Sequence, residues 1–208
     1  AHIVLPTTTM LEDDDLIAVD KPVGVRVIPG RGAAAGPCLK ELVAAHLGSP
    51  AFVVHRLDED TSGAILFAKH AAAHRTLCMQ FERHEVKKTY LARVLGKLEG
   101  EGVINRPIRE FGSGRMGVDR RGKVARTRWR SLESGEASSL IEAEPLTGRR
   151  HQLRVHFYAA GHPILGDTKY GSPRPVGGAD RLMLHATGLR LTAPSGLPLE
   201  LRSPPPWH

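Results

Sequence analysis

The chain has 208 residues, 41% of them hydrophobic, so it is long enough to bury a sizeable core, and we expect one domain over residues 1–208. No apolar stretch approaches the ~18 residues that a membrane span needs, and no basic region followed by an apolar run begins the chain. These features exclude a membrane protein and favour a cytoplasmic one. Cys38 and Cys78 lie far apart without metal-ligand spacing, which favours free thiols.

The first half of the chain alternates short strands and helices. Residues 16–20 (LIAVD) predict a strand that the turn KPVG follows, and LKELVAAHL, residues 39–47, predicts a helix that Gly48 ends. The next predicted elements are two strands, 52–54 and 64–68, then a helix within 70–84 and a strand at 88–96.

The second half adds a strand at 123–131, one at 139–146, a helix that Gly161 ends, and strands within 182–194 and 198–203. In that helix Arg150 and Arg154 are expected to share a face, with Leu153, Phe157 and Ala160 turned to the core. Because strands and helices mix without a steady βαβ rhythm, we expect an α+β fold with a mixed, mainly antiparallel sheet flanked by helices.

The net charge of +7 is concentrated in one segment. Residues 106–130, called here the basic arm, hold nine lysines and arginines against two acidic residues, and the rest of the chain is balanced. Arg126, Arg128 and Arg130 alternate with Thr127 and Trp129, so the three guanidinium groups should share one face of a strand. Such a row suits a phosphate backbone, although a solvated loop that is merely basic would have the same composition.

Two stretches of the basic arm resemble nucleotide-binding loops. GSGRMG, residues 112–117, matches GxGxxG, and GVDRRGKV, residues 117–124, nearly matches the Walker pattern but ends on Val124 instead of Ser or Thr. A phosphate loop follows a buried strand and opens a helix, which neither context predicts, so we interpret neither as a nucleotide site.

Three carboxylates stand in HRLDEDTSG, residues 55–63, between the two predicted strands. Local chemistry alone favours a structural turn, in which His55 or Arg56 pairs with Asp58 or Asp60. That interpretation leaves open whether any of the three carboxylates does chemistry.

The motifs HRLDEDTSG, KKTYLA, GRRHQLRVH, GHPILGDTKYG and LMLHA occur here in this order, and with them the chain resembles the RluA-type family of pseudouridine synthases. The resemblance covers residues 21–186. It implies isomerisation of uridine to pseudouridine in structured RNA, without a cofactor or metal, on the pseudouridine synthase fold with a catalytic cleft across its sheet.

The resemblance also assigns residues. It places the catalytic aspartate on Asp58, with Glu59 and Asp60 as turn residues, the basic partner of that aspartate on Arg154, and the active-site tyrosine on Tyr90. Leu153 stays open between pocket lining and core, and GHPILGDTKYG is interpreted as a turn with a packing role.

RNA contacts are expected from further residues. Arg56 resembles the arginine that fills the space left by the flipped base, and Arg149, Arg150 and His151 would contact phosphate or sugar. The chain begins almost at the catalytic domain, so we expect no separate N-terminal RNA-binding module and a target selected by the basic arm. The expected partner is a stem-loop of ribosomal or transfer RNA, not DNA, and the protein is expected to be a monomer. One departure from the family is Ala193, which stands where a histidine is usual.

The sequence is compared with the requirements of two other functions. A non-catalytic RNA-binding or chaperone protein would be favoured if Asp58, Tyr90 or Arg154 were replaced, and all three are present. A nucleoside hydrolase would need two facing carboxylates, whereas Glu59 points away from Asp58 if the turn is extended.

Overall fold

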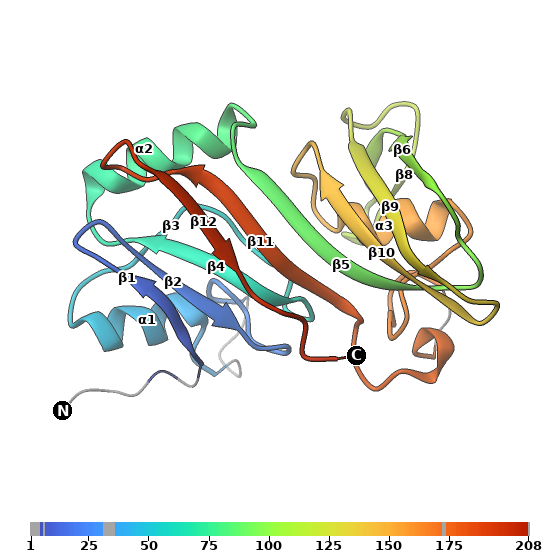
Figure 1. Ribbon diagram of the computed structural model, residues 1–208, viewed down its shortest axis with the longest axis horizontal. Coiled ribbons are helices and arrows are strands. Elements are labelled where there is room, and N and C mark those ends of the chain that lie inside the picture. Colours follow the sequence, from blue (N-terminus) through green and yellow to red (C-terminus); the bar gives the residue numbers. More distant parts are fainter. Residues whose placement is uncertain (1–4, 6, 31–35, 172–173, 208) are drawn as a thin grey trace. The chain divides into compact units, whose positions relative to one another are not determined.

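The computed structural model of the chain describes residues 5, 7–30, 36–171 and 174–207 (Figure 1). The chain divides into two compact units. Unit 1 comprises residues 1–87 and 186–208, and unit 2 comprises residues 88–185. The prediction of one domain over the whole chain stays a prediction.

Unit 1 is built on strands in the order β1-β2-β4-β11, with β3 beside β4 and β12 beside β11. The pairings β1–β2, β2–β4, β3–β4 and β11–β12 are antiparallel. Every residue of β4 is buried, which explains why its sequence is a continuous small and apolar run. The elements are β1 (Thr9–Glu12), β2 (Leu16–Lys21), α1 (Leu39–Leu47), β3 (Phe52–Val53), β4 (Ser62–Ala68), α2 (Ala71–Glu82), β11 (Leu184–Thr192) and β12 (Pro198–Arg202).

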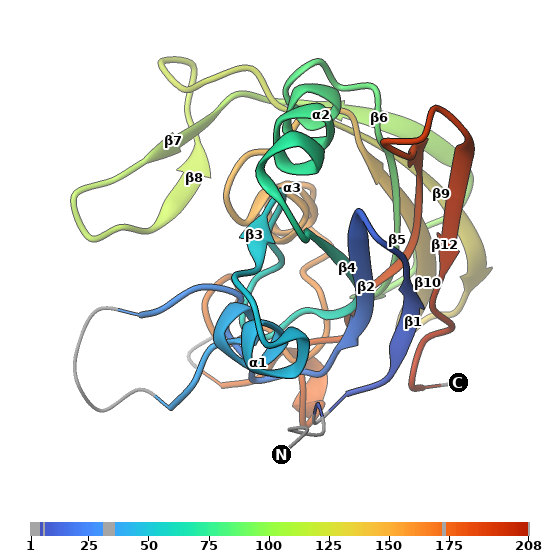
Figure 2. The ribbon, with the colours of Figure 1, turned by 90° about the vertical axis from the view of Figure 1, so that its left-hand side faces the viewer.

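The two helices of unit 1 lie on the same face of its strands (Figure 2). The core between α2 and the strands includes Leu16, Leu66, Leu77, Leu189 and Leu201. Helix α1 ends as the sequence predicted, because Gly48 adopts the left-handed conformation, with φ 68°, that a residue with a side chain disfavours.

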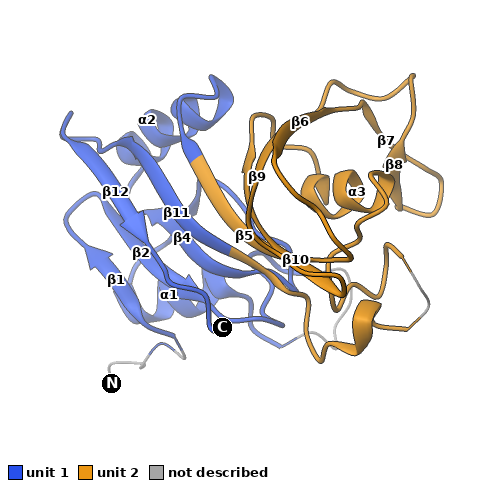
Figure 3. Ribbon diagram, turned by 45° about the vertical axis from the view of Figure 1, so that its right-hand side comes forward, with its two compact units in different colours: residues 1–87, 186–208 blue, residues 88–185 orange. Residues whose placement is uncertain are grey.

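Unit 2 carries strands in the order β5-β10-β9-β6 and a separate two-stranded ribbon, β7–β8 (Figure 3). Helix α3 packs against β8, β9 and β10. The elements of unit 2 are β5 (Lys87–Leu95), β6 (Glu101–Asn105), β7 (Ile108–Glu110), β8 (Met116–Val118), β9 (Arg126–Ser134), β10 (Ser138–Pro145), α3 (Gln152–Ala159) and a 3-10 turn, η1 (Val176–Gly178).

Two apolar clusters hold unit 2 together. One joins β5, β10 and α3 through Val94, Ile141, Leu153 and Phe157, so Leu153 is a core residue. The other joins the β7–β8 ribbon to α3 and includes Ile108, Met116, Ala125, Val155 and Tyr170.

The α+β prediction is confirmed, and one detail of it is wrong. Helix α3 begins at Gln152, so Arg150 precedes the helix and does not share a helical face with Arg154. Ala160 is exposed, and residues 152–157 are all buried, so the helix has no simple apolar stripe. The strands β1, β6, β7 and β8 were not predicted, because each is short and none contains a run of buried residues.

GSGRMG forms the turn and first strand residues of the β7–β8 ribbon, and the next helix begins only at Gln152. This position does not fit a phosphate loop, as the sequence predicted.

Within the ranges that the structure describes, no helix has the length and apolarity to cross a membrane. The same residues hold no group of three or more His, Cys, Asp or Glu side chains with the arrangement of a metal site. Cys38 is buried and Cys78 half-buried, and both are free thiols, as predicted.

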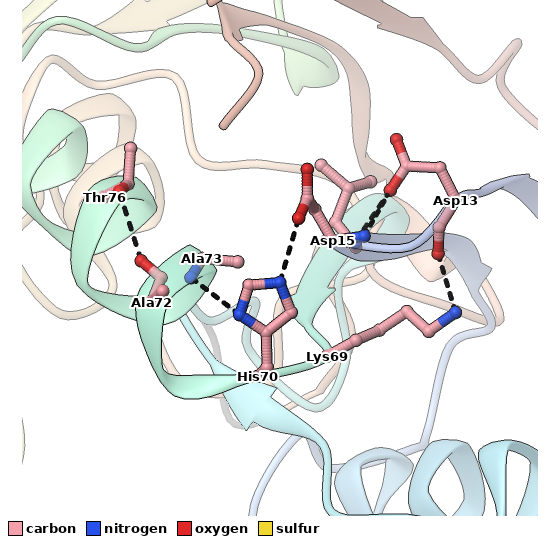
Figure 4. Close-up of polar contacts among 8 residues, drawn as sticks. Asp13, Asp15, Lys69, His70, Ala72, Ala73 and Thr76 are labelled. Carbon is pink, nitrogen blue, oxygen red and sulfur yellow. Dashed lines mark hydrogen bonds and ion pairs between the residues drawn. The ribbon is translucent and has the colours of Figure 1, made fainter. Parts of the chain in front are cut away.

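The start of α2 is fixed by His70, whose imidazole makes two contacts (Figure 4). Its Nδ1 accepts a hydrogen bond of 3.2 Å from the backbone N–H of Ala73, which makes His70 the N-cap of the helix. Its Nε2 lies 2.9 Å from a carboxylate oxygen of Asp15 in the β1–β2 turn. Because Nδ1 is an acceptor, Nε2 carries the proton that Asp15 accepts.

We expect His70→Ala to lower the free energy of unfolding by roughly 0.5–2 kcal/mol, the usual effect of losing an N-cap. Urea unfolding followed by circular dichroism measures it. His70→Asn is the matched control, because asparagine caps helices well and does not reproduce the Asp15 contact. Equal losses in the two variants would assign the stabilisation to Asp15 and not to the cap.

Candidate functional site

The HRLD motif lies in unit 1, in the loop that joins β3 to β4. Asp58 is half-buried, whereas Glu59 and Asp60 are exposed in the turn that follows. The backbone carbonyl of Asp58 accepts a 3.0 Å hydrogen bond from the N–H of Thr61, which closes that turn. The structure thus separates the three carboxylates, and Asp58 alone is partly withdrawn from solvent.

This loop is anchored by Lys21, the last residue of β2, whose side chain is 1% exposed. Its ammonium donates hydrogen bonds to three backbone carbonyls, those of Pro22 at 2.9 Å, Val25 at 2.6 Å and Glu59 at 2.9 Å. The Glu59 carbonyl also accepts the N–H of Gly24 at 2.8 Å. The KPVG turn and the residue next to Asp58 are therefore joined through one buried cation.

Two further contacts fix the ends of the loop. The Nε2 of His55 accepts the N–H of Leu66 at 3.1 Å, and its ring stacks on Phe81 with centroids 4.6 Å apart. Gly63, at φ 120°, lies so close to β11 that a Cβ there would be 2.2 Å from the carbonyl oxygen of Ala186. His55 and Gly63 are therefore structural residues of the motif.

In unit 2, Arg154 is buried inside α3 and forms an ion pair with Asp167 of GHPILGDTKYG. Nε donates to one carboxylate oxygen at 2.9 Å, and Nη2 donates to the other at 2.8 Å. Burial alone would raise the pKa of Asp167, but the hydrogen bonds and the charge of Arg154 outweigh it and hold that pKa below its usual value. The carboxylate is therefore ionised.

Tyr170, three residues after Asp167, connects this pair to its surroundings. Its ring is 1% exposed and lies beneath two guanidinium groups, with the Cζ of Arg115 at 5.0 Å and that of Arg154 at 5.3 Å from its centroid. Its hydroxyl accepts the N–H of Met116 at 3.2 Å and lies 2.6 Å from Nδ1 of His151. GHPILGDTKYG therefore has a larger role than the turn and packing expected from the sequence.

His151 precedes α3 in the left-handed conformation, with φ 55°. Burial, together with the positive charges of Arg154, Lys169 and Arg150, lowers its pKa to about 3. The imidazole is therefore neutral near pH 7. The 2.6 Å contact joins Nδ1 of this neutral imidazole to the hydroxyl of Tyr170.

Tyr90 lies on β5, half-buried against the core cluster that contains Leu153. Lys88 is two residues earlier and so projects from the same face of the strand. Its ammonium lies near Gly148, where a Cβ would be 3.7 Å away, and burial lowers its pKa. Lys88 is a candidate functional residue that the sequence analysis did not identify. The only sequence feature that pointed to it was its place as the second lysine of KKTY.

The expected row of arginines on β9 is present, because Arg126, Arg128 and Arg130 are exposed and Thr127 is buried. Two of them are paired across the strands. Arg128 lies 3.2 Å from Glu144, and Arg130 lies 2.9 Å from Glu142, with both arginine side chains 58% exposed. The net positive charge of this face is therefore smaller than the basic arm alone suggested.

The other expected RNA contacts are spread over both units. In unit 1 Arg56 is exposed, two residues before Asp58 in the chain. In unit 2 Arg149 donates from Nε to the carbonyl of Val124 at 2.9 Å, and Arg150 lies 3.7 Å from Glu110 on β7. In unit 2, Arg115 and the neutral His151 both contact the ring of Tyr170, and Arg150 faces Glu110 of the β7–β8 ribbon.

Comparisons with known proteins identify the family of the chain. The model of the RNA pseudouridylate synthase family matches residues 15–159. The chain is 44% identical to ribosomal large subunit pseudouridine synthase D of Nitrosomonas europaea, over 97% of this chain and 63% of that protein. It is 36% identical to the enzyme of the same name from Escherichia coli, over 97% of this chain and 68% of that protein.

Solved structures are similar too. The human RNA pseudouridylate synthase domain containing 1 superposes with a TM-score of 0.83 at 31% identity, over 98% of this chain and 85% of that one. The human RNA pseudouridylate synthase domain containing 4 has a TM-score of 0.77 at 28% identity, over 95% and 88% of the two chains. The chain spans less than two thirds of the length of the Nitrosomonas relative.

The lowered pKa of His151 predicts how stability depends on pH. The unfolded chain binds a proton at this histidine near pH 6.5, and the folded protein does not until about pH 3, so stability falls as the pH drops from about 6.5 toward 3. We expect His151→Gln to reduce the slope of the free energy of unfolding against pH, by up to about 1.4 kcal/mol per pH unit. Urea unfolding at several pH values between 4.5 and 7 measures the slope.

His84→Asn is the control for that slope, because it removes an exposed histidine and asparagine tolerates the left-handed backbone at this position, φ 57°. Parallel curves for the wild type and His151→Gln would contradict the prediction.

Proposed function

Because the chain belongs to the RNA pseudouridylate synthase family, we propose that it isomerises uridine to pseudouridine in structured RNA. In this reaction the bond from the ribose to N1 of uracil breaks, the base turns over, and a bond from the ribose to C5 forms. The C5 proton is released and N1 takes up a proton, so the reaction is a net isomerisation. The observation that carries the proposal is the position of Asp58 in HRLD, where it is half-buried. The Thr61 N–H bonds its carbonyl, and the ammonium of Lys21 bonds the carbonyl of the next residue, Glu59.

We assign the catalytic role to Asp58. An ionised carboxylate can attack the ribose, attack the uracil ring or abstract a sugar proton, and it can leave afterwards, so the reaction needs no external acceptor. Glu59 and Asp60 are exposed in the turn and have no part in this proposal. No cofactor or metal ion is required by this chemistry.

Tyr90 and Arg154 complete the proposed catalytic set. The ring of Tyr90 offers a face on which the target uracil can stack. Arg154 supplies a fixed positive charge, which keeps a nearby carboxylate ionised when solvent is excluded. The support for both roles is the family resemblance of KKTY and HQLR and, for Arg154, the buried ion pair that orients it.

The proposed substrate is a stem-loop of ribosomal or transfer RNA, bound by a monomer in the cytoplasm, without a role for DNA. Arg56 is proposed to fill the space left by the flipped base, and Arg149, Arg150 and His151 to contact phosphate or sugar. We further propose that the arginines of β9 (Arg126, Arg128 and Arg130) grip the RNA backbone. Exposed ion pairs contribute only about 0–1 kcal/mol, so a phosphate can replace Glu142 or Glu144 as their partner.

Asp58→Asn keeps the size of the side chain and removes its charge, so we expect isomerisation to be lost while RNA affinity stays within roughly tenfold of the wild type. Tritium release from C5-labelled uridine in RNA measures turnover, and filter binding measures affinity. Turnover near the wild-type rate in Asp58→Asn would remove the catalytic assignment.

Glu59→Gln is the matched control for Asp58→Asn, since it neutralises the adjacent carboxylate of the same loop. It should stay active, and an inactive Glu59→Gln would move the catalytic role to that residue.

The double variant Arg128→Gln and Arg130→Gln tests the β9 surface. If both arginines contact phosphates, each releases counterions on binding, so the plot of log affinity against log salt should flatten by about two units. Turnover at saturating RNA should change little, because Asp58, Tyr90 and Arg154 are untouched.

Arg190→Gln with Arg202→Gln is the matched control, since these two arginines of β11 and β12 also form exposed ion pairs with a glutamate, Glu200. Its salt slope should equal that of the wild type. If the β9 variant also keeps the wild-type slope and only melts earlier, the β9 arginines stabilise the sheet and do not bind RNA.

A further inference from the structure

Asp167 is a buried, fully hydrogen-bonded carboxylate of unit 2 that the proposed reaction does not use. It is 1% exposed, and its two oxygens receive Nε and Nη2 of Arg154 at 2.9 and 2.8 Å. The oxygen that accepts Nη2 also accepts the backbone N–H groups of Lys169 at 2.8 Å and Tyr170 at 3.0 Å. The contacts within its own loop hold the carboxylate in place independently of the arginine.

These hydrogen bonds fix the orientation of the Arg154 guanidinium as well as balancing its charge. Two parallel hydrogen bonds along one edge define the plane of the group. The ring of Tyr170, whose centroid lies 5.3 Å from Cζ, supports one face of that plane. A guanidinium carries five N–H donors, so the three that Asp167 does not receive are aimed in a set direction.

Stability alone does not explain why two charges are buried here. Taking both from water is so unfavourable that well-packed apolar residues of similar volume stabilise a core as well or better. The side chains of Arg154 and Asp167 are 5% and 0% exposed, so the desolvation is nearly complete. A requirement for an oriented cation accounts for the pair.

We propose that Asp167 is a positioning residue for catalysis: it holds the guanidinium of Arg154 in the orientation that the isomerisation requires. This role rests on the proposed function, in which Arg154 acts at the reacting groups. Asp167 acts through Arg154 and does not itself touch the substrate.

Asp167→Asn tests the role. The amide keeps one oxygen for the loop N–H groups and replaces the other by an NH₂ group, which cannot accept from Arg154. We expect kcat to fall about 10- to 100-fold, as for a misplaced catalytic group, with the KM for RNA within threefold of the wild type. A wild-type kcat in the folded variant would overturn the proposal.

Ser139→Ala is the matched control for a purely structural effect. Ser139 is fully buried in β10 of the same unit and bridges the N–H of Leu98 and the carbonyl of Gly96, both at 2.9 Å. It should lower the melting temperature and leave kcat unchanged. A similar loss of kcat in Ser139→Ala would make the effect of Asp167→Asn one of general stability and overturn the positioning role.

Arg154→Lys tests whether the orientation of the guanidinium matters even if Asp167→Asn fails to fold. Lysine keeps the positive charge and cannot make the two-point contact with Asp167. We expect a similar loss of kcat, and we expect the double variant to lose no more than Arg154→Lys alone. A lysine variant with wild-type kcat, or additive losses in the double variant, would overturn the proposal.

The Nε–H resonance of Arg154 gives a readout that needs no substrate. It should exchange slowly in the wild type and move and exchange faster in Asp167→Asn; an unchanged resonance would overturn the positioning role. Absence of tritium release from the wild-type protein on every RNA would instead overturn the proposed function, together with the role that rests on it.

Discussion

The ion pair between Arg154 and Asp167 is the interaction on which the arrangement of unit 2 depends. The same carboxylate that receives the guanidinium also accepts two N–H groups of its own loop, and this folds Tyr170 back under the arginine. Tyr170 then packs with Ile108 and Met116 of the β7–β8 ribbon. The buried carboxylate of Asp167 therefore links helix α3, its own loop and the β7–β8 ribbon.

This dependence explains why α3 lacks an ordinary amphipathic pattern. A helix on the surface of a core shows one apolar stripe, whereas α3 is covered by β8, β9 and β10 and buries polar side chains with their partners. His156, for example, is held between the hydroxyl of Thr127 and the carbonyl of Arg106, both at 2.8 Å. Each buried polar group of this kind is satisfied, as burial demands.

The sequence predicted the elements whose pattern is local. Strand β10 alternates buried and half-buried residues, and α1 ends on a glycine, so both were found within a residue or two. Asp167 could not be found in this way, because its partner lies 13 residues away and the intervening chain looks like a turn. Arg150 was misplaced because a spacing of four residues was taken as helical where the helix had not begun.

The net charge of the basic arm, counted from the sequence, likewise left out its partners in the sheet. The basic arm was identified correctly by composition, but the glutamates that face Arg128 and Arg130 belong to the next strand, outside the segment that was counted. Asp119, within the arm, is likewise engaged: the hydrogen bonds from Arg121 hold its pKa below the usual value. The effective charge of a strand surface depends on its neighbours in the sheet, which only the pairing reveals.

The buried ammonium of Lys21 has a consequence for how the HRLD loop keeps its order. Many loops that converge several carbonyl oxygens on one point are held there by a dissolved cation, and their order then varies with the ionic composition of the medium. Here the cation is a side chain, bonded to three carbonyls and tethered to the end of β2, so its local concentration is set by the covalent chain. The loop is accordingly buffered against changes in salt, while the exposed arginines of unit 2 remain fully sensitive to them.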